Sequence, residues 1–264
     1  RYARGRDYHK TLRGRLKQLA QRLEAQLGPF LSRPFTDSAP IFEKTLAQQA
    51  GLGWTGKHTL LIQKQSGSFF VLGELFTGLD IARDTPATAH CGSCTACLDI
   101  CPTRALVAPY QLDARRCIAY LTIEYTGSIP LELRPLIGNR VFGCDDCQLI
   151  CPWNRFARLG TETDFLARHG LDQIGLLDLW HWDETEFLAR TEGSPLRRTG
   201  YAGFMRNVAI ALGNAPPDPA IVQALQQLGH TRGELVAEHA HWALAQQQRR
   251  LPCSGAQSDA DPTA

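Results

Sequence analysis

The sequence is informative first for what it lacks. No apolar run in its 264 residues approaches the roughly 20 residues that a transmembrane helix needs. No secretory signal accompanies its nine cysteines, and the formal net charge is only +2. These absences argue against a membrane-spanning protein, a disulfide-stapled secreted domain and a uniform polycation, and they favour a cytoplasmic setting.

Eight of the nine cysteines lie between residues 91 and 151. The first run, from Cys91 to Pro102, reads C-x2-C-x2-C-x3-C-P, the spacing by which bacterial-type ferredoxins hold cubane iron–sulfur clusters. The second run ends in C-P at Cys151 but has only three cysteines, and Cys117, between the runs, restores the count to eight. Eight thiolates suit two 4Fe–4S clusters, so the sequence predicts a dicluster module.

Two partitions of these thiols are open. In ferredoxins the last cysteine of each run crosses to the other cluster. That rule assigns one cluster to Cys91, Cys94, Cys97 and Cys151, and the other to Cys101, Cys117, Cys144 and Cys147. In the weaker, local alternative Cys101 completes the first set. Structural zinc is disfavoured because a triple run with a trailing C-P fits a tetrahedron poorly, and disulfides are disfavoured because the spacing is that of a metal site.

The rest of the chain predicts an α+β, multidomain protein. Leucines at three-to-four spacing indicate an amphipathic helix over 8–28 that ends at Gly28-Pro29. Two apolar runs around Gln65-Ser-Gly67 indicate a β-hairpin over 59–76. Further helices are expected over 41–50, 113–125, 164–169, 176–180, 184–190, 201–212, 219–228 and 233–250.

These elements divide the chain into four parts. Residues 1–85 form the end of an α/β domain, 86–160 a ferredoxin-type 2×(4Fe–4S) domain and 161–251 a helical domain resembling HEAT-like repeats. Residues 252–264 are expected to be a disordered tail, with Cys253 a free thiol that holds no cluster. Trp180, Trp182 and Trp242 are expected in the core of the helical domain.

The motifs together resemble the epoxyqueuosine reductase family, cobalamin-dependent iron–sulfur enzymes of tRNA queuosine biosynthesis. Besides the cysteine runs, the matching stretches are Gly5-Arg-Asp-Tyr-His9, Arg33-Pro-Phe-Thr-Asp-Ser-Ala-Pro40, Gly51-Leu-Gly-Trp-Thr-Gly-Lys57, Ala114-Arg-Arg-Cys-Ile-Ala-Tyr-Leu-Thr-Ile-Glu124, Asn139-Arg-Val-Phe-Gly-Cys-Asp-Asp-Cys-Gln148 and Arg206-Asn-Val-Ala-Ile-Ala-Leu-Gly-Asn214. The resemblance spans nearly the whole chain. It also implies a preceding section of about a hundred residues, which we expect to be missing because the chain starts with Arg1 rather than Met; part of the corrinoid pocket would lie there.

The resemblance implies an activity: the epoxide of epoxyqueuosine, at the wobble position of tRNA, is reduced to the alkene of queuosine. It also implies cobalamin and two 4Fe–4S clusters as cofactors. The partners would be the tRNA and an external electron donor of flavodoxin or ferredoxin type, and the protein is expected to be a cytoplasmic monomer.

The resemblance assigns Asp37 as the proton donor. An aspartic acid can donate near neutral pH in a desolvated site, such as one closed over by corrin and nucleobase. The alternative from the residues alone is that Asp37 caps a helix that starts near Ile41. Tyr8 and His9 are assigned as residues that position the substrate or supply protons, against the alternative that they pack at the start of the helix.

The same resemblance places cobalamin against Asp37, the glycine-rich turn from Gly51 to Gly56 and the apolar runs after it. The corrinoid contacts implied there are Lys57, His58, Thr59, Leu61 and Gly73. A structural turn would explain the glycines equally well. His58 is not assigned as a cobalt ligand, because the Asp-x-His-x-x-Gly pattern of other corrinoid proteins is absent.

Basic residues indicate where tRNA phosphates could bind. Residues 1–28 contain eight Lys and Arg against one Asp and one Glu, which makes a basic helix face. Arg13 is the candidate phosphate contact on that face. Arg197, Arg198 and Arg206 are candidates on the helical domain. Solvated surface or ion pairing is the alternative for each.

Two other functions fit parts of the sequence. A plain dicluster electron carrier explains the cysteines but leaves Asp37 and the helical end unexplained. A corrinoid reductive dehalogenase shares the cofactors, but such enzymes act on small organohalides and are commonly exported. Salt-sensitive tRNA binding would separate both from the queuosine interpretation.

Overall fold

The structure is a computed structural model that describes residues 2–37 and 39–251. Ser38, the 252–264 tail and Cys253 within it lie outside the described residues. The α-helices are α1 (Tyr8–Leu27), α2 (Glu43–Gln49), α3 (Ala96–Asp99), α4 (Ile118–Ile123), α5 (Arg134–Ile137), α6 (Asp146–Leu149), α7 (Leu176–His181), α8 (Glu184–Arg190), α9 (Gly200–Asn214), α10 (Pro219–Leu228) and α11 (Glu234–Arg250). The 3-10 helices are η1 (Tyr2–Arg4), η2 (Ala114–Arg116), η3 (Pro152–Phe156), η4 (Thr163–Phe165), η5 (Pro195–Thr199) and η6 (Gly229–Thr231).

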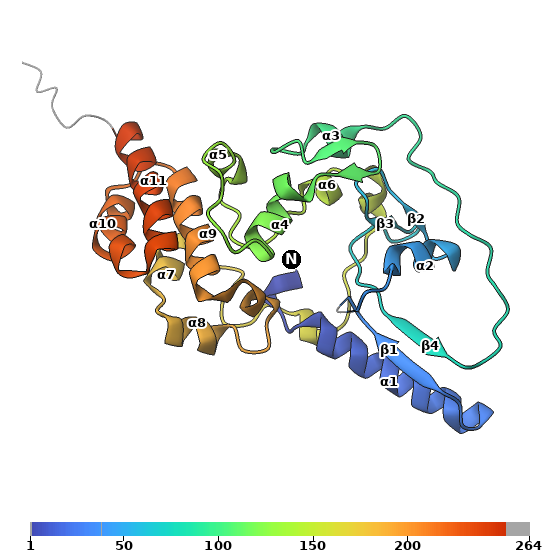
Figure 1. The fold of residues 1–264 in the computed structure, drawn as a ribbon. Coiled ribbons are helices and arrows are strands. Elements are labelled where there is room, and N and C mark those ends of the chain that lie inside the picture. The colour runs from blue at the N-terminus through green and yellow to red at the C-terminus, as the bar shows by residue number, and fades with distance from the viewer. Residues whose placement is uncertain (1, 38, 252–264) are drawn as a thin grey trace, which may run out of the picture.

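The strands form three small antiparallel pairs. They are β1 (Ser32–Phe35) with β4 (Glu74–Thr77), β2 (Trp54–Thr55) with β3 (Leu61–Ile62), and β5 (Leu106–Ala108) with β6 (Gln111–Leu112). Figure 1 shows helices α7 to α11 gathered at one end of the molecule and α1 with β1 and β4 at the other. The cluster module, with α3, α4 and α6, lies between them. The mixed α and β architecture confirms the predicted class.

The predicted hairpin over 59–76 is wrong. β3 pairs with β2, which precedes it, and β4 pairs with β1, so neither apolar run is the other's partner. What remains of the hairpin is a single isolated bridge between Gln63 and Gly67. Both runs are extended as expected, but each pairs with a strand earlier in the chain.

Two predicted helices are also corrected. The segment 113–125 breaks at Cys117, whose backbone is extended between η2 and α4. Because of this break, the Cys117 side chain does not follow the direction that a continuous helix would give it. The segment 164–169 holds only η4. By contrast, α8 and α10 have the predicted bounds, and α1 and α11 differ from theirs by one residue at one end.

α1 is fixed at its start by the helical end of the chain. Asp7 caps the helix by accepting from the His9 backbone N–H at 3.0 Å. Its own backbone N–H donates to the Gly193 carbonyl at 2.7 Å, and the Arg6 N–H donates to the Asp164 carbonyl at 2.7 Å. The first turn of α1, with Tyr8 and His9, is therefore held against residues more than 150 positions away.

Two apolar cores meet at α9. The larger lies among α7 to α11 and includes Trp180, Trp182, Met205 and Val208, with Trp242 packed against it, as the sequence predicted. The smaller joins α4, α5 and the 128–133 segment, and Ile210 from α9 completes it. α9 thus connects the cluster module to the helical end through buried apolar area, the main stabilising contribution to folding.

Candidate functional site

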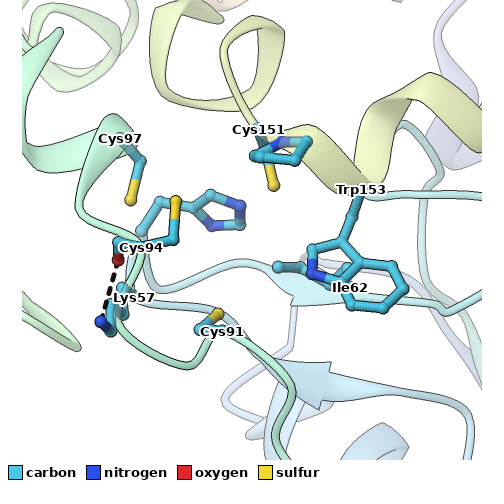
Figure 2. A pocket seen from close by; sticks show the side chains of 9 residues that line it. Lys57, Ile62, Cys91, Cys94, Cys97, Cys151 and Trp153 are labelled. Atoms are coloured by element: carbon cyan, nitrogen blue, oxygen red, sulfur yellow. Dashed lines mark hydrogen bonds between the residues drawn. The ribbon is translucent and has the colours of Figure 1, made fainter.

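Four thiols line one pocket, three from the start of the first cysteine run and one from the end of the second run. Cys91, Cys94, Cys97 and Cys151 line it together with Lys57, His58, Ile62, Pro152 and Trp153 (Figure 2). Figure 2 shows the sulfur atoms of the four cysteines directed toward a common space from two separate segments. Cys101 does not line this pocket.

The second set of thiols surrounds Cys147. Burial and then, in decreasing order, the charges of the neighbouring Cys144, Cys117, Cys97 and Cys101 together raise the pKa of this thiol to about 12. Burial likewise raises the pKa of Cys144 to about 11. Crowded, desolvated thiols of this kind become thiolates only when a cation compensates their charge, which is what iron supplies.

The donor chemistry fits iron–sulfur clusters better than the alternatives. All eight cysteines of the described residues are free thiols, so no disulfide competes for them. Across the described ranges no group of three or more His, Cys, Asp or Glu is placed to hold a single metal ion. Thiols that surround a space without converging on one point suit a cube of four irons, whose corners lie apart, rather than a zinc tetrahedron.

Lys57 fixes the loop of the first cysteine run. Its Nζ donates to the carbonyl of Gly92 at 2.7 Å and to that of Cys94 at 2.9 Å (Figure 2 draws the latter bond). The backbone around it is tight: Gly56 abuts the side chains of Ile62 and His58, so that a Cβ there would collide. The glycine-rich turn therefore brings Lys57 against the cluster loop.

His58 is buried beside the same pocket. It is 3% exposed, and its Nδ1 accepts the Leu60 backbone N–H at 3.2 Å. Its Nε2 consequently carries the ring proton and has no hydrogen-bond partner in the described residues. Burial lowers the pKa of His58 to about 4, so the ring is neutral at physiological pH.

The other predicted corrinoid contacts lie in different surroundings. Thr59 follows His58 in a left-handed conformation, with φ of 68°. Leu61 is 3% exposed in the core, so its side chain faces protein. Gly73 backs onto α1, where a Cβ would meet Leu12 and Leu16. None of these observations identifies a corrin surface.

A second group of polar side chains surrounds Asp37. Tyr8 Oη donates a short hydrogen bond to Asp37 Oδ2, and His9 Nε2 lies 3.4 Å from the same oxygen. His9 Nδ1 is 2.7 Å from Asp7 Oδ1, so the α1 cap residue also orients the ring. Asp37 itself is left-handed, with φ of 52°, a conformation that a non-glycine residue rarely adopts.

The cap interpretation of Asp37 is wrong. α2 begins at Glu43, its N-cap residue is Phe42, and that cap makes no side-chain hydrogen bond. The carboxyl of Asp37 instead meets Tyr8 and His9, two residues that the sequence placed in the same site. Asp7, which orients His9, was missed, although its position before a helix in Gly5-Arg-Asp-Tyr-His9 is a recognisable cap signal.

Some of the predicted phosphate contacts are accessible in the structure and one is buried. Arg13 and Arg197 are exposed. Arg198 is half-exposed and pairs with Glu124 at 2.7 Å; the nearby charges of Asp37 and Tyr8 contribute to the rise of its pKa, so it lies within electrostatic range of that site. Arg206 is a correction: it is 0% exposed and donates to backbone carbonyls, so it cannot reach a phosphate.

The fold and the two sets of thiols define the class, a double-cluster iron–sulfur protein. A family model described as "4Fe-4S double cluster binding domain" matches residues 90–154, and one described as "Epoxyqueuosine reductase QueG, DUF1730" matches residues 1–38. The epoxyqueuosine reductase of Xanthomonas campestris is 59% identical over 93% of this chain and 69% of its own length. That of Pseudomonas aeruginosa is 61% identical over 92% and 68%. The chain belongs to the epoxyqueuosine reductase family.

A solved structure agrees in fold. An epoxyqueuosine reductase crystallised with an epoxyqueuosine-modified tRNA-Tyr stem loop superposes with a TM-score of 0.83 at 30% identity. The match covers 93% of this chain and 65% of that one, so the chain spans about two thirds of the length of its relatives. No helix of the described residues is both long and apolar enough to cross a membrane.

Proposed function

We propose that the protein to which this chain belongs reduces epoxyqueuosine to queuosine at the wobble position of tRNA. The observation that carries the proposal is the group formed by Asp37, Tyr8 and His9, which sits in one molecule with two sets of cluster-forming thiols. A plain electron carrier has no use for the first group. Family membership supplies the substrate.

The cofactors proposed are two 4Fe–4S clusters and cobalamin. We assign Cys91, Cys94, Cys97 and Cys151 to one cluster and Cys101, Cys117, Cys144 and Cys147 to the other. When bound, the clusters supply single electrons and cobalamin supplies a low-valent cobalt that reduces the epoxide. Lys57, His58 and Thr59 are proposed to meet the corrinoid beside the first cluster, with Leu61 and Gly73 behind them.

The reaction requires a proton at a defined place. The epoxide carbon–oxygen bonds break, a carbon–carbon double bond forms, and the oxygen leaves as water with two electrons and two protons. An alkoxide is a poor leaving group, so an acid must protonate it. Asp37 is proposed to do so, while Tyr8 and His9 hold its carboxyl in place and Asp7 holds the His9 ring.

The finer organisation is also proposed here. Residues 1–85 would complete a corrinoid-binding α/β domain, 86–160 the dicluster domain, and 161–251 a helical domain with HEAT-like repeats. Arg13, Arg197 and Arg198 would contact tRNA phosphates, since they are accessible and Arg198 adjoins the Asp37 site. We further propose a cytoplasmic monomer that receives electrons from a flavodoxin- or ferredoxin-type donor.

An Asp37→Asn variant of the full-length enzyme tests the assignment. It is expected to bind about eight irons and cobalamin as the wild type does, and to lose turnover of epoxyqueuosine tRNA roughly 100-fold or more. Asp84→Asn, on the exposed segment between β4 and α3, is the matched control and should keep full turnover. Normal turnover by the Asp37 variant would reject the proton-donor role. Eight irons with neither cobalt uptake nor salt-sensitive tRNA binding would support the electron carrier instead.

A further inference from the structure

His58 places an unpaired hydrogen-bond donor beside the first set of thiols. Its ring is 3% exposed and lines the same pocket as the four cysteines (Figure 2). Because Nδ1 accepts the Leu60 backbone N–H, the ring proton is on Nε2. Nε2 is buried, and no atom of the described residues accepts from it. A buried donor without a partner destabilises a protein, so this one requires an explanation.

The rest of the ring is in contact with protein. Nδ1 faces Leu60, and Cε1 lies against Gly56, where an added Cβ would come within 2.9 Å of it. One edge of the ring is therefore held by the glycine-rich turn. The opposite edge, formed by Nε2 and Cδ2, is the one left to meet whatever the pocket contains.

Sulfur is the acceptor that this pocket provides. Besides His58 and the four cysteines, the pocket is lined by Lys57, Ile62, Pro152 and Trp153. The side chains of Lys and Trp only donate, and those of Ile and Pro are apolar. Lys57 Nζ already donates to two carbonyls. A trapped water needs two to four polar partners, which these side chains do not offer.

We propose that His58 Nε2–H donates a hydrogen bond to a sulfur atom of the cluster held by Cys91, Cys94, Cys97 and Cys151, and that this bond raises the reduction potential of that cluster. Reduction adds negative charge that the sulfur atoms share, so an N–H donor stabilises the reduced form more than the oxidised form. The role rests on the cluster assignment proposed above. It is separate from the corrinoid contact proposed for the same turn, which main-chain atoms can make.

Two substitutions separate the two nitrogens of the ring. The amide of asparagine lies near the position of Nδ1, so His58→Asn can still accept the Leu60 N–H but has no donor toward the pocket. The amide of glutamine reaches the position of Nε2, so His58→Gln keeps a donor there and loses the bond to Leu60. A purely structural role of His58 predicts that the glutamine variant is the more disturbed. The proposed role predicts the reverse.

The measurement is a redox titration of the full-length enzyme, followed by electron paramagnetic resonance at about pH 8, where an exposed histidine is neutral. In His58→Asn the potential of one cluster should fall by about 59 mV, which is a tenfold loss in a one-electron equilibrium, and the other cluster should not respond. His58→Gln should stay near the wild type. His90→Gln, which removes an exposed ring beside Cys91, is the control and should leave both potentials unchanged. A wild-type potential in His58→Asn overturns the inference. An equal fall in His58→Gln also overturns it, because packing would then set the potential.

Isotope labelling tests the contact without relying on a His58 variant that holds its cluster. Electron spin echo spectra of the reduced enzyme should contain a nitrogen coupling that changes when only the histidines carry the heavy nitrogen isotope. The same change should occur in His90→Gln. Spectra that ignore the label overturn the inference, even if His58→Asn fails to assemble its cluster. A wild type with a single cluster couple would reject the two-cluster assignment and the hydrogen bond with it, whereas two couples that ignore His58 would reject the hydrogen bond alone.

Discussion

At the scale of single residues, Arg206 shows how a cation can serve the fold rather than a ligand. Its guanidinium donates to the carbonyls of Leu121 at 2.7 Å, Tyr125 at 2.7 Å and Gly127 at 2.8 Å, and to the Asn207 side chain at 2.9 Å. Carbonyls at the end of α4 have no helical partner and carry partial negative charge. Burial lowers the pKa of Arg206 to about 10, which still leaves it charged at neutral pH.

Arg206→Met should therefore destabilise the chain without touching a tRNA contact. The substitution leaves three buried carbonyls unsatisfied and is expected to cost about 2–4 kcal/mol in urea unfolding. Arg206→Lys should recover only part of the loss, since an ammonium cannot reproduce the planar fork. Arg249→Met, on the exposed end of α11, is the control. Unchanged stability together with weakened tRNA binding would restore Arg206 to the phosphate contacts.

At the scale of elements, local patterns predicted helices well and strand partners poorly. α8 and α10 begin after their N-cap residues, Asp183 and Asp218, and end where their apolar spacing stops. Both signals are local in the sequence. β4 pairs with β1, which lies far earlier in the sequence, and no short window records that pairing. β2 lies only a few residues before β3, but the sequence analysis assigned it to a glycine-rich turn. The break at Cys117 was hidden for a similar reason, because Ile118 and Leu121 continue a helical pattern.

In the candidate site, too, the sequence predicted what local motifs carry and missed what depends on the fold. Spacing predicted that the eight thiols serve two clusters but left two partitions open, and a family motif placed Asp37 in one site with Tyr8 and His9. The neighbour Glu43 was missed, because it looks like an ordinary solvent-facing helix residue until the fold brings its carboxylate to the Asp37 backbone N–H. Arg206 was misassigned because the local sequence around an arginine in an apolar helix does not show whether its side chain faces solvent or the buried end of another helix.

Lys57 makes the glycine-rich turn a support for the cluster loop, and this can be tested. Lys57→Met removes two charge-assisted hydrogen bonds from the loop between Cys91 and Cys94, a loss of about 1.5–3 kcal/mol for each bond. The loop should open more often, so a chelator should bleach the cluster absorbance several-fold faster. Lys64→Met, equally basic and exposed, should bleach at the wild-type rate. An unchanged rate in Lys57→Met would mean that the cysteines hold the loop unaided.

At the scale of the whole molecule, one polar seam joins the dicluster module to α11. Arg134, 1% exposed, donates to the Ile129 carbonyl at 2.8 Å and pairs with Glu238. Ser128 also donates to Glu238, at 2.8 Å. His239 completes the seam: its Nδ1–H donates to the Leu235 carbonyl at 2.7 Å, and its Nε2 accepts the Ile129 N–H at 3.2 Å. The bond from Ile129 requires an unprotonated Nε2, and therefore the neutral ring, so the seam is sensitive to acid.

Acid should loosen this seam through His239. Burial, then the nearby Arg134 and Arg206, lower its pKa to about 4 from an ordinary 6.5, while Glu238 opposes the shift. The stabilisation is therefore fully present above pH 6.5 and is lost as the pH falls toward 4, by roughly 3 kcal/mol at most. In His239→Gln, whose amide oxygen can still accept from Ile129, urea unfolding should depend less steeply on pH across that window, whereas the exposed His241→Gln should follow the wild type. Parallel pH curves for the wild type and His239→Gln would show that the seam does not titrate through His239.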